Sequence, residues 1–304
     1  MSRFLNSKYS MLEAYTPGEQ PVDMKYIKLN TNESPYPPSK RVLDAISSAE
    51  VSKLNLYSDP TCKSFKKRIA ELYRVKSENV FVSNGSDDIL NFSFMAFCEG
   101  TKRGVKFPEI SYGFYSVYAK LHGVKYDAIP LESDFSIDIE KYCDNSSTVL
   151  IANPNAPTGI ALSHTQIEEI VRANKDYIVL VDEAYVDFGA ESCIDLIDKY
   201  DNLLVVQTYS KSRSMAGARL GFGFACPQLI ADLETLRYST NPYNVNRLTL
   251  LAGKAAMEGF RDVPGTGIIV FYPHGGVSQV QRAQMVTQEG SNVAVCAVYG
   301  NFDD

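Results

Sequence analysis

Residues 203–221 read LLVVQTYSKSRSMAGARLG, an apolar run that leads into a loop with one lysine and two arginines. The run LLVVQT is short and continuously apolar, which is typical of a strand buried on both faces. Strands are also expected at 80–83, 104–107, 126–129, 148–152, 177–182 and 221–225. Helical stretches are expected at 64–72, 87–97, 112–121, 165–174, 194–200, 228–237 and 245–257. This alternation predicts an α/β fold, with a mostly parallel sheet covered by helices on both faces.

The composition excludes several classes of protein. A chain of 304 residues with 45% hydrophobic and 22% charged residues is typical of a soluble globular protein of one large or two ordinary domains. No apolar run is long enough for a membrane helix, and no secretory signal is visible, so we expect a cytoplasmic protein. A net charge of 30 − 36 = −6 argues against nucleic-acid binding. Six scattered cysteines and three scattered histidines disfavour a zinc site or a Ser-His-Asp triad.

The residues that follow each expected strand are the candidates for chemistry, because such sheets bind ligands beyond the carboxyl ends of their strands. Gly85, Ser86 and Asp87 follow the first strand and open a helix, whose free N–H groups suit a phosphate. The turn NPNAPTG at 153–159 leaves asparagine side chains available to donate. Asp182 ends a buried strand and therefore needs a partner, and Tyr185 offers a phenol nearby.

Lys211 stands just beyond the apolar run LLVVQT. Desolvation there would lower the lysine pKa and make the amine nucleophilic, and Arg219 would supply a fork for phosphate. Each of these loops alone also fits an ordinary helix cap, a structural turn or a solvated lysine. One ligand would explain all of them: it carries a phosphate, a ring nitrogen that needs an anion, a ring oxygen that needs a donor and an aldehyde. Pyridoxal phosphate has these groups.

Residues 1–258 resemble the histidinol-phosphate aminotransferases, which are fold-type I pyridoxal-phosphate enzymes of histidine biosynthesis. The resemblance rests on seven segments that occur in the family's order. They are LNTNESPYPPS, LYSDP, SNGSDD, PEISYGFY, NPNAPTG, VDEAYVDF and YSKSRSMAGARLGF.

The resemblance implies three catalytic residues. Lys211 would bind the cofactor and move the proton, Asp182 would keep the ring nitrogen protonated, and Tyr185 would hydrogen-bond the ring oxygen. Tyr112 would stack on the ring. The cofactor phosphate would be held by Thr208, Ser210, Arg219, the backbone of Gly85, Ser86 and Asp87, and Tyr57 from the other subunit of a homodimer. Many relatives have an asparagine where this chain has Ala156, and Asn155 is the nearest substitute at the ring oxygen.

The resemblance also implies the substrates. Histidinol phosphate would give up the amino group, and 2-oxoglutarate and glutamate would form the second pair. A threonine-phosphate decarboxylase of cobalamin synthesis shares the same cofactor layout and is an alternative. A third possibility is a cofactor-binding remnant without activity.

Residues 259–304 resemble an internal fragment of threonine synthase, a fold-type II pyridoxal-phosphate enzyme. The sequence therefore predicts an N-terminal arm at 1–40, a large domain at 41–258 and a foreign fragment at 259–304, with the small C-terminal domain missing or replaced. The fragment is expected to form a strand at 268–272, a helix at 278–287 and a strand at 293–298. It carries no lysine of its own family's site, so we expect neither a second site nor completion of the first.

Overall fold

The computed structural model describes residues 32–258, except for residues 35, 47 and 99–103. The expected arm at 1–40 is therefore described only in its last residues. The elements expected within 259–304 lie outside the described residues.

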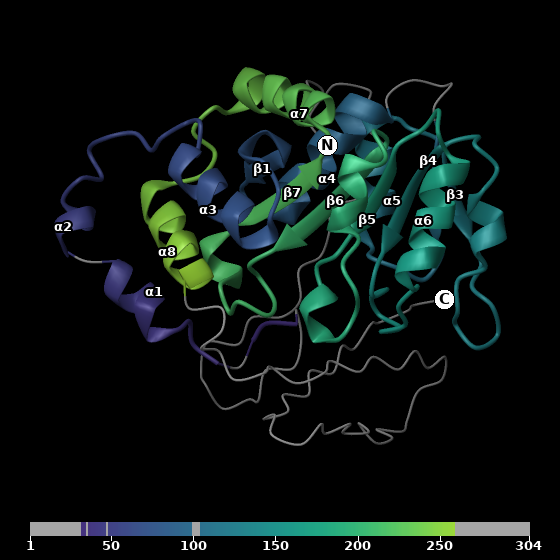
Figure 1. The fold of residues 1–304 in the computed structure, drawn as a ribbon, viewed down its shortest axis with the longest axis horizontal. Helices are drawn as coiled ribbons and strands as arrows, with labels where there is room; N and C mark the ends of the chain where they lie inside the picture. Colours follow the sequence, from purple (N-terminus) through teal and green to yellow (C-terminus); the bar gives the residue numbers. More distant parts are fainter. Residues whose placement is uncertain (1–31, 35, 47, 99–103, 259–304) are drawn as a thin grey trace, which may run out of the picture.

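The described strands form one sheet of seven, in the order β1-β7-β6-β5-β4-β2-β3 (Figure 1). β7 runs antiparallel to both of its neighbours, whereas the pairs from β6 to β3 are parallel. The prediction of a mostly parallel sheet is thus confirmed. The strands are β1 (Val80–Ser83), β2 (Val105–Pro108), β3 (Tyr126–Ile129), β4 (Thr148–Ala152), β5 (Val179–Asp182), β6 (Leu203–Thr208) and β7 (Gly221–Ala225).

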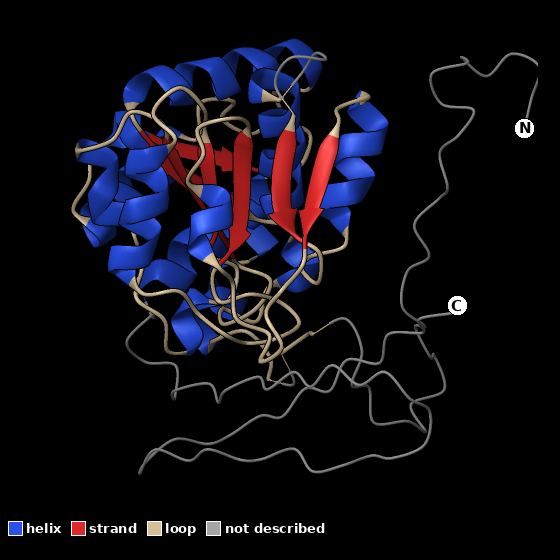
Figure 2. Cartoon of the chain, turned by 90° about the vertical axis from the view of Figure 1, so that its right-hand side faces the viewer, coloured by secondary structure: helices blue, strands red, loops and turns tan. Residues whose placement is uncertain are grey.

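Both faces of the sheet are buried, because successive side chains along a strand point to opposite sides. On β4, Val149 and Ile151 belong to one apolar cluster, while Leu150 and Ala152 belong to another. The first cluster includes side chains of α3 (Lys63–Tyr73), α6 (His164–Ala173) and α8 (Arg247–Glu258). The second includes side chains of α4 (Ser86–Phe97), α5 (Phe114–His122) and α7 (Pro227–Thr240). Figure 2 shows helices on both sides of the sheet, as the sequence predicts.

The expected helices agree with the structure to within three residues at each end, apart from the one expected at 194–200. That segment forms the 3₁₀ turn η5 (Ile194–Asp198), because the chain must enter β6 at Leu203. Two short helices precede α3, namely α1 (Lys40–Ala45) and α2 (Ser48–Val51), and α1 packs against α8 (Figure 1). No helix within the described ranges has the length and apolar character needed to cross a membrane.

Gly221 begins β7 directly against the turn that joins β1 to α4. A Cβ atom at this position would lie 2.4 Å from the carbonyl carbon of Gly85 and from the amide nitrogen of Ser86. Both atoms belong to the backbone, so the strand or the turn would have to shift. This close approach explains the glycine in the sequence ARLGF.

We therefore expect Gly221→Ala to lower the free energy of unfolding by about 1–3 kcal/mol, the usual cost of overpacking. Urea unfolding followed by circular dichroism measures this change. Gly113→Ala is the matched control, since a Cβ atom there has no neighbour within 4 Å, and it should change stability by less than about 1 kcal/mol. Equal stability of the two variants would contradict the close packing.

Candidate active site

A cavity of about 300 Å³ lies at the carboxyl ends of β4, β5 and β6, beside the first turn of α4. Nine of the site residues expected from the sequence line it together. They are Ser86, Asp87, Tyr112, Asp182, Tyr185, Thr208, Ser210, Lys211 and Arg219. These residues come from five separate segments of the chain, and only the sheet brings them to one place.

The loop that carries Lys211 is held by a buried arginine. Arg213 donates to the carbonyl oxygen of Thr208 at 3.0 Å and forms an ion pair with Asp187 at 3.2 Å. Ser212 also donates to Asp187. Asp187 belongs to η4 (Val186–Phe188), directly after Tyr185, so this ion pair fixes the lysine loop against the tyrosine segment. The ammonium nitrogen of Lys211 lies 5.5 Å from the centre of the Tyr185 ring.

Asp182 is a buried carboxylate at the end of β5. Its Oδ2 atom accepts from the Tyr115 hydroxyl at 3.1 Å, and its Oδ1 atom accepts from the backbone N–H of Ala184 at 3.1 Å. Burial raises the pKa of Asp182 to about 6, although these two hydrogen bonds oppose the shift. Both partners are neutral, so a cation placed in the cavity beside Asp182 would favour its charged form.

The opposite end of the cavity suits an anion. Ser86 begins α4 after Gly85, whose φ of 89° is a conformation that favours glycine. Arg219 donates to Asp87 at 3.0 Å and to the Ser210 hydroxyl at 3.4 Å. The hydroxyl of Thr208 lies 3.0 Å from that of Ser210. A phosphate here would meet the N–H groups of a helix N-terminus, two hydroxyls and a guanidinium.

Tyr112 closes this side of the cavity. Its hydroxyl donates to Asp87 at 2.7 Å. Burial and the nearby Asp87 carboxylate raise the pKa of Tyr112 well above its ordinary value. The phenol therefore stays neutral and presents an aromatic face to the cavity.

Three expected site residues, Gly85, Asn155 and Tyr57, do not line this cavity, although Gly85 directly precedes Ser86, which does. Asn155 is buried, and its amide nitrogen donates to the carbonyl oxygen of Ile110 at 2.9 Å, while its Oδ1 atom accepts from Ser111 at 2.8 Å. The structure thus places Ala156, not Asn155, at the cavity wall, because the amide of Asn155 is used on Ile110 and Ser111 in the loop after β2. Tyr57 is 78% exposed and stacks on Tyr243 at a distance of 4.4 Å between ring centres.

Sequence reasoning missed three residues at or next to the cavity. Glu33 lines it, and Asn32 donates from its amide nitrogen to the Tyr185 hydroxyl at 2.8 Å. Both lie in the segment LNTNESPYPPS, which the motif comparison singled out without assigning it a role. Tyr115, the partner of Asp182, stands three residues after Tyr112, and this helical spacing could have signalled it.

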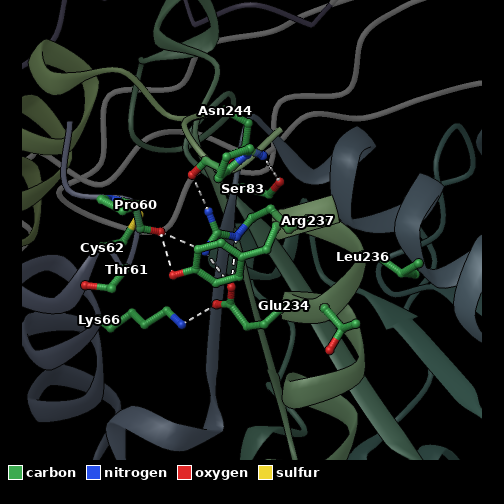
Figure 3. A network of polar contacts seen from close by, with 12 residues as sticks. Pro60, Thr61, Cys62, Lys66, Ser83, Glu234, Leu236, Arg237 and Asn244 are labelled. Carbon is green, nitrogen blue, oxygen red and sulfur yellow. Dashed lines mark hydrogen bonds and ion pairs between the residues drawn. The ribbon is translucent and has the colours of Figure 1, made fainter. Parts of the chain in front are cut away.

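A second polar network connects the Tyr57 loop to the anion-binding end of the cavity (Figure 3). The buried Arg237 of α7 donates to the carbonyl oxygens of Pro60 at 2.8 Å and Pro242 at 3.0 Å, and to Glu234 at 2.9 Å. Asn244 donates to the Ser83 hydroxyl at 2.7 Å and to Asp88 at 2.8 Å. The loop after α7 therefore fixes both the Tyr57 loop and the start of α4.

The raised pKa of Asp182 makes stability depend on pH. The folded-state pKa of about 6 lies above the 3.8 of the unfolded chain, so the folded state binds this proton more tightly. The resulting stabilisation is complete below about pH 4 and is lost as the pH rises through 6.

We expect Asp182→Asn, measured without added ligand, to gain stability relative to the parent chain as the pH rises from 4 to 7. The gain should reach about 3 kcal/mol, the equivalent of the shift in pKa. Urea unfolding of both proteins at each pH gives the difference, in which the titration of other groups largely cancels. A difference that stays constant with pH would show that Asp182 does not titrate in this range.

The comparisons with known proteins agree with this geometry. The family model for class I and II aminotransferases matches residues 24–264. A histidinol-phosphate aminotransferase of Brachyspira hyodysenteriae is 53% identical over 261 residues, which are 85% of this chain and 73% of that protein. The one of Clostridium acetobutylicum is 49% identical over 258 residues, with the same shares of the two chains.

A solved structure has the same fold. The histidinol-phosphate aminotransferase of Sinorhizobium meliloti, in complex with pyridoxal-5'-phosphate, superposes with a TM-score of 0.69 at 23% identity, over 77% of this chain and 64% of that chain. The structural similarity shows the fold, whereas the family match and the identity to the curated relatives also establish the family. This chain belongs to the class I and II aminotransferase family.

Proposed function

We propose that this chain is a pyridoxal-phosphate-dependent aminotransferase that acts on histidinol phosphate. The observation that carries the proposal is the cavity itself. It gathers a lysine, a buried aspartate, a phenol and an anion-binding end within about 300 Å³. The two curated relatives named above are histidinol-phosphate aminotransferases, which supports this substrate.

The residues present fit the cofactor. Its phosphate would be held by the N-terminal turn of α4 together with Thr208, Ser210 and Arg219. Its protonated ring nitrogen would pair with Asp182, whose burial is unfavourable for a charged carboxylate without a cation. Tyr185 would donate to the ring oxygen, and the face of Tyr112 would cover the ring. Gly85 contributes through its backbone, beside the Arg219 guanidinium.

Each residue then has a separate task in transamination. When bound, pyridoxal phosphate supplies an aldehyde that captures an amino group and a ring that takes up electrons. The amine of Lys211 would hold the cofactor until the substrate's amino group displaces it. The freed amine would then remove the proton from the substrate α-carbon and deliver it to the former aldehyde carbon of the cofactor. Asp182 keeps the ring nitrogen protonated, because a nearby anion favours the charged form. The apolar strands that surround these groups exclude water and strengthen both electrostatic contacts.

The same cavity would serve both half-reactions. Histidinol phosphate gives up its amino group in the first, and 2-oxoglutarate receives it in the second, which yields glutamate. Both substrates are small anions. We also propose that the enzyme is cytoplasmic.

We propose that two chains form a homodimer and that Tyr57 of each chain reaches the cofactor phosphate of the other. Tyr57 is far too exposed for a side chain that serves its own subunit's buried site. Its loop is nonetheless held firmly, since Arg247 donates to the Tyr57 carbonyl oxygen at 3.1 Å and Ser58 donates to that of Val245 at 2.7 Å. Exposed apolar side chains accompany it, namely Leu43, Ile46, Val51, Leu54 and Leu56. Such a patch is typical of a protein interface.

We also propose that residues 1–40 form an arm, that residues 41–258 form the cofactor-binding domain, and that residues 259–304 do not complete the site. The family match ends at residue 264, close to this boundary, which supports the division. The threonine synthase resemblance of residues 259–304 remains a prediction from the sequence.

The first test is the reaction itself. Purified protein with pyridoxal phosphate should show a visible absorption band, and Lys211→Ala should lose the band and lower any transaminase activity by at least about 1,000-fold, since the amine both binds and moves the proton. The assay supplies histidinol phosphate and 2-oxoglutarate and measures glutamate. Release of carbon dioxide from threonine phosphate would favour the decarboxylase alternative. Absence of the band in the parent chain would refute cofactor binding.

We expect the 304-residue chain to bind the cofactor but to transaminate slowly, since positioning of the substrate dominates the rate. A chain in which the C-terminal segment of a curated relative follows Glu258 serves as the comparison and should be faster. If the parent chain already works at the rate of that hybrid, residues 259–304 complete the site and the proposed division is wrong.

Hybrid dimers test the exchange of Tyr57. Tyr57→Phe should weaken cofactor binding by about 10-fold, the loss of one hydrogen bond to a charged group, without changing the sedimentation coefficient. A dimer of one Tyr57→Phe chain and one Lys211→Ala chain, purified through two different tags, should contain one site with the parent affinity. If Tyr57 serves its own subunit, that hybrid has no intact site, and its affinity stays weak.

A further inference from the structure

Tyr185, which lines the cavity, is contacted by an amide that comes from the start of the described chain. Asn32 precedes Tyr185 by 153 positions, yet its Nδ2 atom donates to the Tyr185 hydroxyl at 2.8 Å. The Oδ1 atom of Asn32 is buried and accepts no hydrogen bond from the described residues. The amide is therefore oriented by its contact with the phenol rather than by a network of its own.

The lining of the cavity contains no other amide near this phenol. Ala156 occupies the wall and has no polar side-chain atom. The neighbouring Asn155 uses its amide nitrogen on the carbonyl oxygen of Ile110 and on Thr158. An amide function that the turn at 153–159 could have supplied is thus absent from the wall, whereas Asn32 supplies one to Tyr185, which lines the wall.

The contact leaves the phenol able to donate. A hydroxyl that accepts a hydrogen bond still has its own hydrogen. Accepting a hydrogen bond also polarises the hydroxyl and strengthens its donation to a third group. An amide that donates to Tyr185 thus directs the phenol hydrogen away from Asn32, while an acceptor in the same place would attract it.

The segment around Asn32 is attached to the catalytic loop. The Ser34 hydroxyl accepts from that of Ser214 at 2.8 Å, and Ser214 lies three residues after Lys211. Glu33, which stands between Asn32 and Ser34 in the sequence, lines the cavity. The segment thus contacts both Tyr185 and the lysine loop.

We propose that Asn32 is a positioning residue that acts through Tyr185, by donating to the phenol so that the phenol hydrogen points to the cofactor's ring oxygen. This inference rests on the proposed function, because it requires pyridoxal phosphate in the cavity. It gives Asn32 an indirect effect on the ring oxygen, for which the sequence had suggested a direct contact from Asn155.

The test is the pH dependence of the visible absorption band of the purified, cofactor-loaded chain. Without the Asn32 amide, the Tyr185 phenol donates more weakly to the ring oxygen. The negative charge on that oxygen is then less stabilised, so the neighbouring proton is held more tightly and the midpoint pH of the band rises. Asn32→Ala should raise the midpoint by about 0.5–1 pH unit, the equivalent of one net hydrogen bond. Asn32→Asp should raise it further, because a carboxylate accepts the phenol hydrogen.

Two controls separate this role from a structural one. Ser34→Ala weakens the same segment's contact with the lysine loop but keeps the amide, so its midpoint should equal that of the parent chain. In a Tyr185→Phe background, Asn32→Ala should cause no further shift, since the amide then has no hydroxyl to act on.

The outcomes separate the inference from the proposed function. No visible band in the parent chain would refute the proposed function and the inference together. A band with an unchanged midpoint in Asn32→Ala, or with the parent midpoint in Asn32→Asp, would refute the inference alone. An equal shift in Ser34→Ala, or a full shift in the Tyr185→Phe background, would show that displacement of the segment rather than the amide is responsible, and would also overturn it.

Discussion

The ion pair between the buried Arg213 and the partly exposed Asp187 is the contact on which the arrangement of the site depends. Arg213 follows Lys211 by two residues, and Asp187 follows Tyr185 by two residues, so one ion pair connects the loops that carry both groups. Removing Asp187 would leave the buried guanidinium of Arg213 without its charged partner, which is unfavourable in an apolar interior. Because Arg213 also binds the carbonyl oxygen at the end of β6, the loop after this strand can hardly move independently of the sheet.

The anion-binding end depends on packing rather than on charge alone. β7 approaches the turn at Gly85 so closely that only glycine fits at position 221. From the other side, Asn244 binds Ser83 and Asp88, and the same loop is fixed by Arg237. The first turn of α4 is therefore held by the strand beneath it and by the loop beside it. A rigid helix N-terminus loses little entropy when it binds a phosphate.

Most strands were predictable from the sequence because they are buried on both faces, so they became apolar runs such as LLVVQT, whereas the edge strand β3 (YDAI) is largely exposed. Lys211, Asp182 and Tyr185 were predictable as neighbours for the same reason, since they follow strands whose ends meet at one edge. The position of Asn155 was not predictable, because its amide bonds to Ile110 and Ser111 in the loop after β2, and the local sequence does not reveal which groups are within reach. Asn32 was missed because its partner lies 153 residues away, where no local pattern reports the contact.

Burial of Asp182 explains why the fold and the cofactor would stabilise one another. A carboxylate with a pKa near 6 at the end of a buried strand holds its proton more tightly than an exposed one does, because burial disfavours the charge. A cationic ring nitrogen would reverse this preference, so the energy lost by burying the group is recovered only when the ligand binds. A ligand that binds the folded state alone stabilises it in proportion to the logarithm of its concentration. The unfavourable burial of one aspartate therefore makes the sheet's carboxyl edge specific for a ligand that carries a positive charge at that point.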